Sequence, residues 1–495
     1  MKRLLLLLSL CFCVGASAQT DSLYKEQYRP RFHFSPSVNW CNDPNGLVYH
    51  NGKYHLFYQF NPFGNVWGHM TWAHATSKDL IHWKHLPIAI AEEKDTMIFS
   101  GTCVVDKNNT SGFGKNGQIP MVAVYTGHIE NKNQSQHIAY SLDNGVSWTK
   151  YNKNPVLDLG KKDFRDPKIF WYEPKQYWVM AVMFPVEHFV QFYSSGNLKD
   201  WKHLSDFGPV GDTSGVWECP DLTQVPVEGL PGKKKWVLQT SQNASMQYFV
   251  GEFDGIRFTN ENPINKIVRP DYGPDYYAAI AYNQLPVAHL PTAIGWINNW
   301  NYANDIPTAP WKGAFSLPRT MKVKKVNNEW GLIQQPVAAV KTLRTRPLEI
   351  KNHGVTGTFT LPRKSRQFEM LLTYEPSAST SGIRLATGNN SYFEIGYDAV
   401  KKTVYIDRTK TGQTDFNKNF SSLSRFETPV VLKNKKLKLN IFYDHSIAEV
   451  FVNDGEAVLT AQLFSVDTNN GIEIFSNGGR SAVIFLKLWD IKSIW

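Results

Sequence analysis

Three acidic residues stand in matching local settings and could act together. Asp43, Asp166 and Glu218 each precede an aromatic or β-branched run, a turn and a second such run. After Asp43 the turn is Asn51-Gly52, a strong β-hairpin signal. Cleavage of a glycosidic bond needs two carboxyl groups, one to attack or stabilise the sugar carbon and one to protonate the leaving oxygen. The three acids could meet at one such site if their hairpins surround a common axis.

The sequence neighbours of the three acids suggest different roles. Asp43 lies among amide side chains and the backbone N–H groups of a Pro-Asn-Gly turn, which favours a carboxylate. Arg165 precedes Asp166 and is expected to keep it ionised. Glu218 has apolar neighbours on both sides, a setting that suits a protonated general acid.

Each acid also has a purely structural interpretation. Asp-Pro-Asn-Gly at Asp43 is common turn chemistry, and Arg165-Asp166 could be an ion pair. Glu218 could be one carboxylate at a strand edge among 43 acidic residues. Their shared position at the starts of equivalent units favours a common site.

The region from residue 43 to about 317 predicts an all-β domain made of repeated units. The pattern S-x-x-L-x-x-W-K-H-L occurs at 77–86 and again at 195–204, each time after a predicted strand. Repeats of four strands at such intervals are typical of propeller blades. We therefore expect a five-bladed β-propeller, in which equivalent unit starts converge on the central channel. The unit starts are Asp43, Ser100, Asp166, Glu218 and Asp275, spaced by 57, 66, 52 and 57 residues.

The remaining segments predict the domain organisation. Residues 333–343 break the strand pattern and indicate a linker or short helix, and the following alternating strands are typical of a β-sandwich. We predict a signal peptide at 1–18, a propeller at 19–335, a linker at 336–345 and a β-sandwich at 346–495.

Composition and the N-terminal residues indicate an exported globular protein. The 495 residues carry a formal charge of +10 spread over scattered lysines, which does not favour nucleic-acid binding. Lys2-Arg3, an apolar run and Ala16-Ser17-Ala18 predict a signal peptide cleaved near Ala18, hence a periplasmic or extracellular protein. No later apolar run is long enough to span a membrane. After cleavage three cysteines remain, and we interpret them as packing residues.

Several ordered blocks resemble glycoside hydrolase family 32, which includes invertases, inulinases and levanases. The resemblance covers nearly the whole mature chain. Its blocks are 40–46 (WCNDPNG), 99–101 (FSG), 164–168 (FRDPK), 217–221 (WECPD), 295–300 (GWINNW), 311–319 (WKGAFSLPR), 405–408 (YIDR) and 449–453 (EVFVN). One departure is Cys41, where many members have methionine.

This resemblance implies a propeller followed by a sandwich, and cleavage of fructosyl bonds with retention of configuration. It implies Asp43 as nucleophile, Glu218 as general acid/base and Asp166 as transition-state stabiliser, with no metal or organic cofactor. The implied substrate contacts are Asn42, Gln59, Trp67, Phe99, Ser100, Arg165 and Trp296.

Other activities stay open at this point. A fructosyltransferase would use the same acids, and an endo-acting levanase would share the scaffold. A sugar-binding propeller without catalysis would not need three matched acids. The Asn-Asp-Pro-Asn-Gly and Glu-Cys-Pro blocks disfavour an arabinose- or xylose-releasing hydrolase. The sequence does not separate levan, inulin and sucrose, although the 295–302 segment favours fructose release from the end of a fructan.

Overall fold

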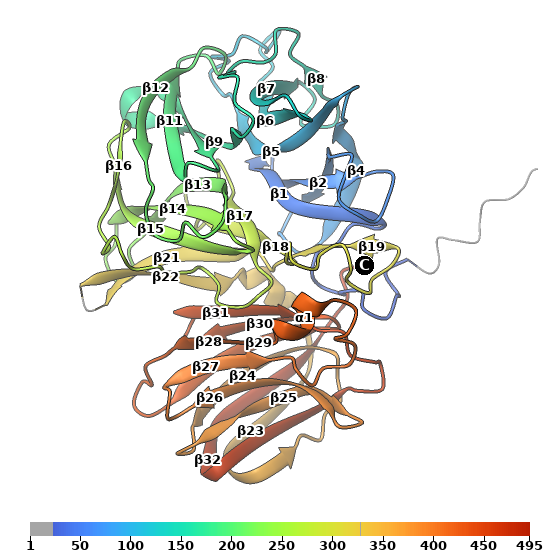
Figure 1. Ribbon diagram of the computed structural model, residues 1–495. Coiled ribbons are helices and arrows are strands. Elements are labelled where there is room, and N and C mark those ends of the chain that lie inside the picture. Colours follow the sequence, from blue (N-terminus) through green and yellow to red (C-terminus); the bar gives the residue numbers. More distant parts are fainter. Residues whose placement is uncertain (1–22, 327) are drawn as a thin grey trace, which may run out of the picture.

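The computed structural model describes residues 23–326 and 328–495, so the predicted signal peptide lies outside the described residues. The chain forms a five-bladed β-propeller followed by a β-sandwich, as predicted (Figure 1). Among the residues that the structure describes, no helix is long and apolar enough to cross a membrane.

Five antiparallel sheets form the blades, and the first strand of each contacts its neighbours around the central axis. A short 3-10 helix, η1 (Glu173–Lys175), connects two strands of the third blade. The first blade consists of β1 (Asn39–His50), β2 (Lys53–Asn61), β3 (Thr71–Ser77) and β4 (Trp83–Ile90), and the second of β5 (Thr96–Val105), β6 (Met121–Ile129), β7 (Asn133–Ser141) and β8 (Thr149–Lys150). The third consists of β9 (Arg165–Tyr172), β10 (Tyr177–Phe184), β11 (Phe189–Ser195) and β12 (Lys202–Phe207), and the fourth of β13 (Trp217–Pro226), β14 (Lys234–Gln242), β15 (Ser245–Phe253) and β16 (Phe258–Asn260). The fifth consists of β17 (Tyr277–Ala281), β18 (Thr292–Ile297), β21 (Arg319–Val326) and β22 (Glu329–Pro336).

Two short strands follow β18 and complete the ring. β20 (Ala314–Phe315) pairs with β18 inside the fifth blade. β19 (Trp311–Lys312) instead pairs in parallel with the start of β1, so a late segment joins the first blade. This pairing closes the propeller between its last and first blades.

The repeated sequence pattern forms the same turn in two blades. Leu80 and Leu198 are both buried and adopt a left-handed conformation, with φ of 71° and 65°. The preceding serines, Ser77 and Ser195, accept hydrogen bonds from backbone N–H groups of these turns. Each turn leads from the third strand of a blade to its outermost strand, which explains the repeat.

The β-sandwich is one continuous sheet that folds over itself. The long strands β23 and β32 pair with each other and contribute to both layers, with the edge strands β28 and β31 at opposite ends of the order. The strands are β23 (Arg344–Thr360), β24 (Gln367–Glu375), β25 (Thr380–Gly388), β26 (Ser391–Asp398), β27 (Thr403–Asp407), β28 (Arg425–Pro429), β29 (Leu437–Asp444), β30 (Ile447–Val452), β31 (Ala457–Gln462) and β32 (Gly471–Ile491), with one α-helix, α1 (Lys418–Ser422).

The prediction that residues 333–343 break the strand pattern was wrong for its first part. Residues 333–336 are the end of β22 and pair with β21. Only η2 (Ala338–Leu343), a 3-10 helix, departs from strand structure before β23 begins. Gln334 and Gln335 are polar residues inside a strand. Gln334 is nevertheless buried, and its side-chain amide donates to the backbone oxygen of Pro270.

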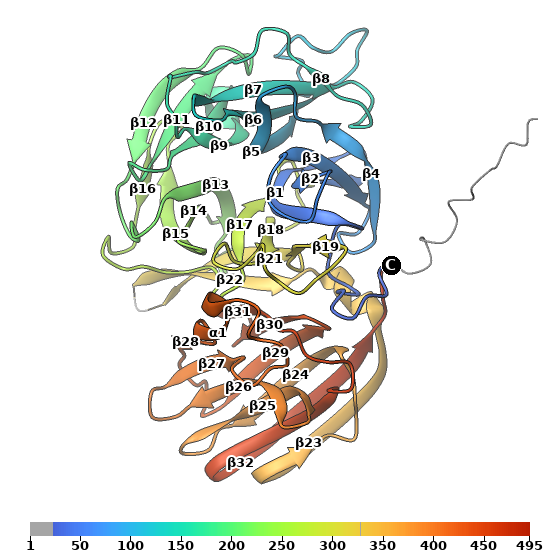
Figure 2. The ribbon, with the colours of Figure 1, turned by 45° about the vertical axis from the view of Figure 1, so that its right-hand side comes forward.

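A buried ionic cluster joins the two domains, which lie against each other in both ribbon views (Figures 1 and 2). His33, from the segment before β1, bonds Asp444 at 2.8 Å and Glu449 at 2.9 Å. Glu449 also pairs with Arg319 of the fifth blade, which bonds Asp271 at 2.9 Å. Burial alone lowers the pKa of His33, but the two carboxylates outweigh it and raise that pKa to about 9.

The His33→Gln variant tests this interface. Because the pKa of His33 is raised from 6.5 to about 9, its charge stabilises the folded state fully below pH 6.5, and this stabilisation is lost as the pH rises through 9. We expect wild type to exceed the variant in melting temperature by about 5 °C at pH 6, and by much less at pH 10. A difference in melting temperature that stays constant over this range would contradict a charged His33.

Candidate active site

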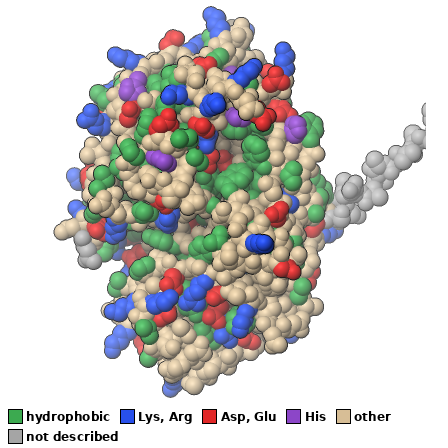
Figure 3. Space-filling model, in the orientation of Figure 1, with side chains coloured by type: hydrophobic (Ala, Val, Ile, Leu, Met, Phe, Trp, Pro, Cys, Tyr) green, Lys and Arg blue, Asp and Glu red, His purple; other side chains and the backbone are tan. Residues whose placement is uncertain are grey.

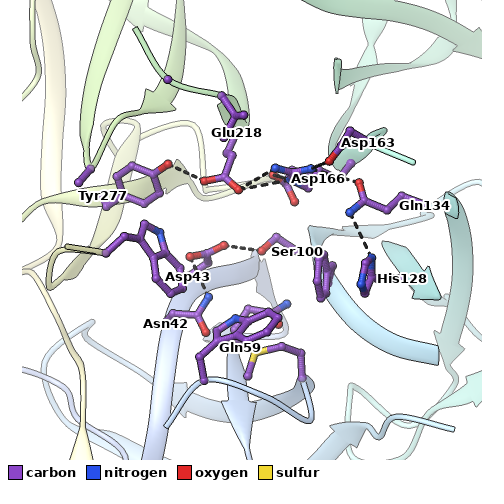
Figure 4. Close-up of a pocket in the computed structure, with 18 of the residues that line it drawn as sticks. Asn42, Asp43, Gln59, Ser100, His128, Gln134, Asp163, Asp166, Glu218 and Tyr277 are labelled. Carbon is purple, nitrogen blue, oxygen red and sulfur yellow. Dashed lines mark hydrogen bonds and ion pairs between the residues drawn. The ribbon is translucent and has the colours of Figure 1, made fainter. Parts of the chain in front are cut away.

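The five inner strands surround a pocket of about 620 Å³ at one mouth of the central channel. The face shown in Figure 3 is hollowed near the middle of the propeller, and Figure 4 shows acidic and amide side chains pointing into the pocket from several blades. The lining residues include Asn42, Asp43, Gln59, Trp67, Phe99, Ser100, Arg165, Asp166, Glu218, Tyr277, Trp300 and Asn301.

Each inner strand has a register shift where it reaches this pocket. In the five strands β1, β5, β9, β13 and β17 the shift spans residues 42–43, 99–100, 166–167, 219–220 and 278–279. A bulge interrupts the ladder and turns side chains that would otherwise alternate between sheet faces. Three of the shifts include or adjoin a proline, which cannot donate to the ladder. The bulges therefore aim one set of residues from every blade at the same space.

Asp43 lies in a bulged strand rather than in the turn that the sequence predicted. Ser100 Oγ donates to Asp43 Oδ2 at 2.6 Å, and Asn42 Nδ2 donates to Oδ1 at 3.0 Å. Asn42 is itself held by Trp40, whose indole N–H donates to Asn42 Oδ1 at 2.8 Å. Gly46, with φ of 55°, follows closely, and a Cβ there would lie 2.7 Å from the Phe57 ring.

Burial raises the pKa of Asp43, and the nearby Glu218 carboxylate raises it further, despite the two hydrogen bonds. The local hydrogen bonds do favour the ionised form, as predicted, but burial and the Glu218 charge outweigh them and the net shift of the pKa is upward. Sequence neighbours could not reveal this, because the opposing Glu218 comes from another blade.

Asp166 occupies a constrained position between two blades. Its backbone has a φ of 64°, and its N–H donates to Thr126 Oγ1 at 2.9 Å. The backbone N–H of Cys219 donates to Asp166 Oδ2 at 3.0 Å. Burial raises the pKa of Asp166 to about 7, Arg165 opposes that shift, and Glu218 and Asp43 add to it.

From its position in the sequence, Arg165 was expected to pair with Asp166. Its guanidinium pairs mainly with Glu218 instead. Its Nε and Nη2 donate to Glu218 Oε1 at 3.3 and 3.1 Å, whereas Nε lies 3.9 Å from Asp166 Oδ2. Tyr277 Oη donates to Glu218 Oε2 at 2.5 Å. The apolar setting expected for Glu218 was wrong, because both of its carboxylate oxygens accept hydrogen bonds from polar donors.

Of the seven predicted binding residues, the pocket brings six together: Asn42, Gln59, Trp67, Phe99, Ser100 and Arg165. Among the described residues, the buried amide of Gln59 has no hydrogen-bond partner at either end, so both ends can bind a polyhydroxyl ligand. Trp296 does not reach the pocket wall. It is fully buried against Trp40 and Trp300, and Trp300 lines the pocket in its place.

Sequence reasoning missed several other lining residues. Tyr277 lies two residues after the expected unit start at Asp275, so the repeat could have identified it. His128, Gln134 and Asp163 come from the second blade and the segment after it, and bear no shared motif. His128 stacks on Phe99 with ring centroids 4.3 Å apart, and Asp163 bonds Arg165 at 2.8 Å.

The channel beyond the three acids is nearly closed. The next cavity along it has a volume of about 10 Å³ and is lined by residues such as Pro44, Thr102, Lys168 and Pro220. Such a space holds at most about one water molecule. The pocket is therefore a dead end, with its acids at the bottom and Trp67, whose side chain is exposed, at the rim.

The arrangement places a buried carboxyl group, Asp43, opposite a second one, Glu218, that is held by a guanidinium and a phenol. Cys219 Sγ lies 3.6 Å from Asp43 Oδ2 and 3.7 Å from Asp166 Oδ2, and the Glu218 charge raises the pKa of both aspartates, so the three acids interact electrostatically. Such a group can supply both a nucleophile and a proton donor. Among the described residues, no three His, Cys, Asp or Glu side chains are grouped to hold a metal ion.

The Asp166→Asn variant is expected to be more stable than wild type at pH 8. Because folding raises the pKa of Asp166 from 3.8 to about 7, charging it costs stability, increasingly as the pH rises from 4 to 7. We expect the variant's melting temperature to exceed that of wild type by about 5 °C at pH 8, and by almost nothing at pH 4.

The control is Asp163→Asn, which removes a half-exposed rim carboxylate that also bonds Arg165. It should not reproduce the pH-dependent gain. If Asp166→Asn were less stable than wild type at pH 8, the result would contradict the expected cost of a charged Asp166 in the folded protein.

Two family models match this chain. The N-terminal domain of the glycosyl hydrolases family 32 matches residues 33–336, and the C-terminal domain of that family matches residues 339–490. A levanase of Bacillus subtilis is 43% identical over 99% of this chain and 74% of its own length. An extracellular exo-inulinase of Aspergillus niger is 38% identical over all of both chains.

A solved structure shows the same fold with a bound fructoside. The β-fructofuranosidase of Schwanniomyces occidentalis, complexed with fructosyl-erythritol, is 31% identical and has a TM-score of 0.88 over 96% of this chain and all of its own. The matches cover both the propeller and the sandwich. The chain belongs to glycosyl hydrolase family 32.

Proposed function

We propose that this protein is a retaining β-fructosidase that releases fructose from the ends of fructan chains. The dead-end pocket carries this proposal, because only a terminal sugar can reach acids at the bottom of a closed channel. The levanase and exo-inulinase relatives support fructan as the substrate. Sucrose, which also ends in a fructosyl unit, is a second substrate that the same pocket would accept.

In the first step, a carboxylate oxygen of Asp43 attacks C2 of the terminal fructosyl unit and forms an ester bond. The bond from C2 to the leaving oxygen breaks, and its electrons stay on that oxygen, which takes a proton from Glu218. The hydrogen bonds from Ser100 and Asn42 hold the Asp43 carboxylate in place for this attack.

In the second step, water enters where the leaving chain was. Glu218, now a carboxylate, takes a proton from this water, and the water oxygen attacks C2. The C2–Asp43 bond breaks and its electrons return to Asp43, which regenerates the enzyme. Two displacements at C2 keep the β configuration of the released fructose.

Asp166 and Arg165 assist without transferring a proton in either step. Asp166 faces the space beside Asp43 and would accept hydrogen bonds from fructosyl hydroxyl groups, which strengthen as positive charge develops at the ring. Arg165 steadies Glu218 through two hydrogen bonds to one oxygen. Gln59, Asn42 and Trp67 would contact the sugar as well.

Export belongs to the same proposal. The N-terminal residues predict a signal peptide, and one relative is named an extracellular enzyme. Fructans are polymers, so an enzyme that degrades them from the chain end acts where the polymer is, outside the cytoplasmic membrane.

Substitutions of the two main acids should differ in their dependence on the leaving group. Asp43→Ala removes the covalent route, and kcat should fall by roughly four orders of magnitude or more on all substrates. For Glu218→Gln, kcat should fall as far on inulin but much less on β-fructosyl fluoride, because the fluoride leaving group needs little protonation. Single-turnover kinetics measure both effects. Equal losses for Glu218→Gln on the two substrates would contradict an acid/base role.

Product analysis tests the proposed activity as a whole. Levan, inulin and sucrose are digested separately, and we expect fructose as the sole early product from each fructan. Early NMR spectra should show β-fructofuranose before mutarotation. Release of fructan oligosaccharides would indicate endo action, growth of longer chains would indicate transfer, and early α-fructose would mean inversion.

A further inference from the structure

The β-sandwich contacts a loop that forms part of the pocket wall. Residues 298–310 connect β18 to β19, and Trp300 and Asn301 of this loop line the pocket. In both ribbon views, α1 lies on the edge of the sandwich that faces the propeller (Figures 1 and 2). The contacts of this edge reach the loop at buried and exposed positions.

The buried contact centres on Arg408, which follows β27. Its Nη2 donates to Tyr302 Oη at 3.0 Å, and its Nη1 donates to Asp275 Oδ2 at 2.9 Å. Tyr302 in turn donates to Asp275 Oδ1 at 2.5 Å. Phe420 of α1 packs edge-on against the Tyr302 ring and beneath the guanidinium. All four side chains are buried, so this part of the loop has one fixed position.

The exposed contacts lie on either side of that anchor. Asn419 Nδ2 donates to the backbone oxygen of Asn301 at 3.1 Å, and Asn417 Nδ2 donates to Asp305 Oδ2 at 2.6 Å. The same loop also holds the rim of the pocket at Trp67, because Asn304 Oδ1 accepts from the backbone N–H of Trp67 at 3.0 Å. Sandwich, loop and rim thus form a continuous chain of contacts.

These contacts concern the mouth of the pocket and not its floor. Asp43, Asp166 and Asn42 are buried and Glu218 is partly buried, whereas Asn301 is exposed and Trp67 is 40% exposed. A fructosyl unit at the acids places the rest of the chain toward the mouth of the pocket, whose lining includes Trp67, Trp300 and Asn301. The loop therefore faces the leaving part of the substrate.

We propose that the β-sandwich, through Arg408 and Asn419, positions the wall that binds the leaving fructan chain. This rests on the proposed fructan-releasing function of the pocket. The two side chains are positioning residues, since neither lines the pocket. Their contribution is to the binding of substrates that extend past the first sugar, and not to the chemistry at Asp43.

The test is Asn419→Ala, which removes one surface hydrogen bond to the loop. We expect KM for an inulin-type tetrasaccharide to rise roughly threefold to tenfold. On β-fructosyl fluoride, which has no sugar beyond the fructosyl unit, kcat/KM should stay within about twofold of wild type. Arg408→Lys keeps the charge opposite Asp275 but loses the bond to Tyr302, and it should change the tetrasaccharide KM in the same direction.

The matched control is Asn477→Ala, which removes an exposed amide hydrogen bond to Thr380 inside the sandwich, without contact to the loop. Melting temperatures show that each variant is folded. The inference is overturned if Asn419→Ala and Asn477→Ala have the same KM for the tetrasaccharide. It is also overturned if Asn419→Ala loses kcat/KM equally on the tetrasaccharide and on β-fructosyl fluoride. A wild type inactive on both substrates would instead refute the proposed function.

Discussion

The bulges of the inner strands are the constraint on which the site depends. Regular strands would send alternate side chains to the two faces of each blade, and few would point along the channel. The bulges turn Asp43, Asp166 and Glu218 into one space, where backbone strain is tolerated because five packed sheets fix the chain. The positive φ of Asp166 and Cys219 belongs to this strain. Neighbouring blades supply the groups that hold each acid, such as Ser100, Arg165 and Tyr277.

The same constraint sets the electrostatics of the pocket. Three carboxyl groups lie close together with one guanidinium near them, and two of the three, Asp43 and Asp166, are buried. Burial raises the pKa of Asp43 and Asp166, so the group of acids keeps a proton at a pH where isolated carboxyl groups have lost theirs. The burial that raises these pKa values opposes the charge that Asp43 needs as a nucleophile, and the hydrogen bonds from Ser100 and Asn42 offset part of that cost. Burial of these carboxyl groups also lowers the stability of the folded protein at neutral pH, where they lose their protons.

Much of the fold was predictable because local signals agreed with the global one. The Asn51-Gly52 turn, the repeated serine-to-tryptophan turns and the regular spacing of unit starts all predicted four-stranded blades, and the structure confirms five. The positions of the three acids followed from the same repeat. The surroundings of the acids did not, because they come from other blades: Glu218 meets Arg165 and Tyr277, which are 53 and 59 residues away in the chain. Trp296 shows the same limit: it lies in β18, all of whose residues are buried, whereas Trp300 in the following loop lines the pocket.

The parallel pairing of β19 with β1 has a consequence for the order of folding. The first blade receives its closing strand only from residues 311–312, after most of the propeller has been synthesised. The segment before that blade is held by Asp444 and Glu449, which come later still. Contacts of such long sequence separation form slowly, because a long loop must close first. A chain that emerges from its N-terminus therefore stays without a finished first blade until residues 311–312 are available, and without its full interface between the domains until the sandwich is complete.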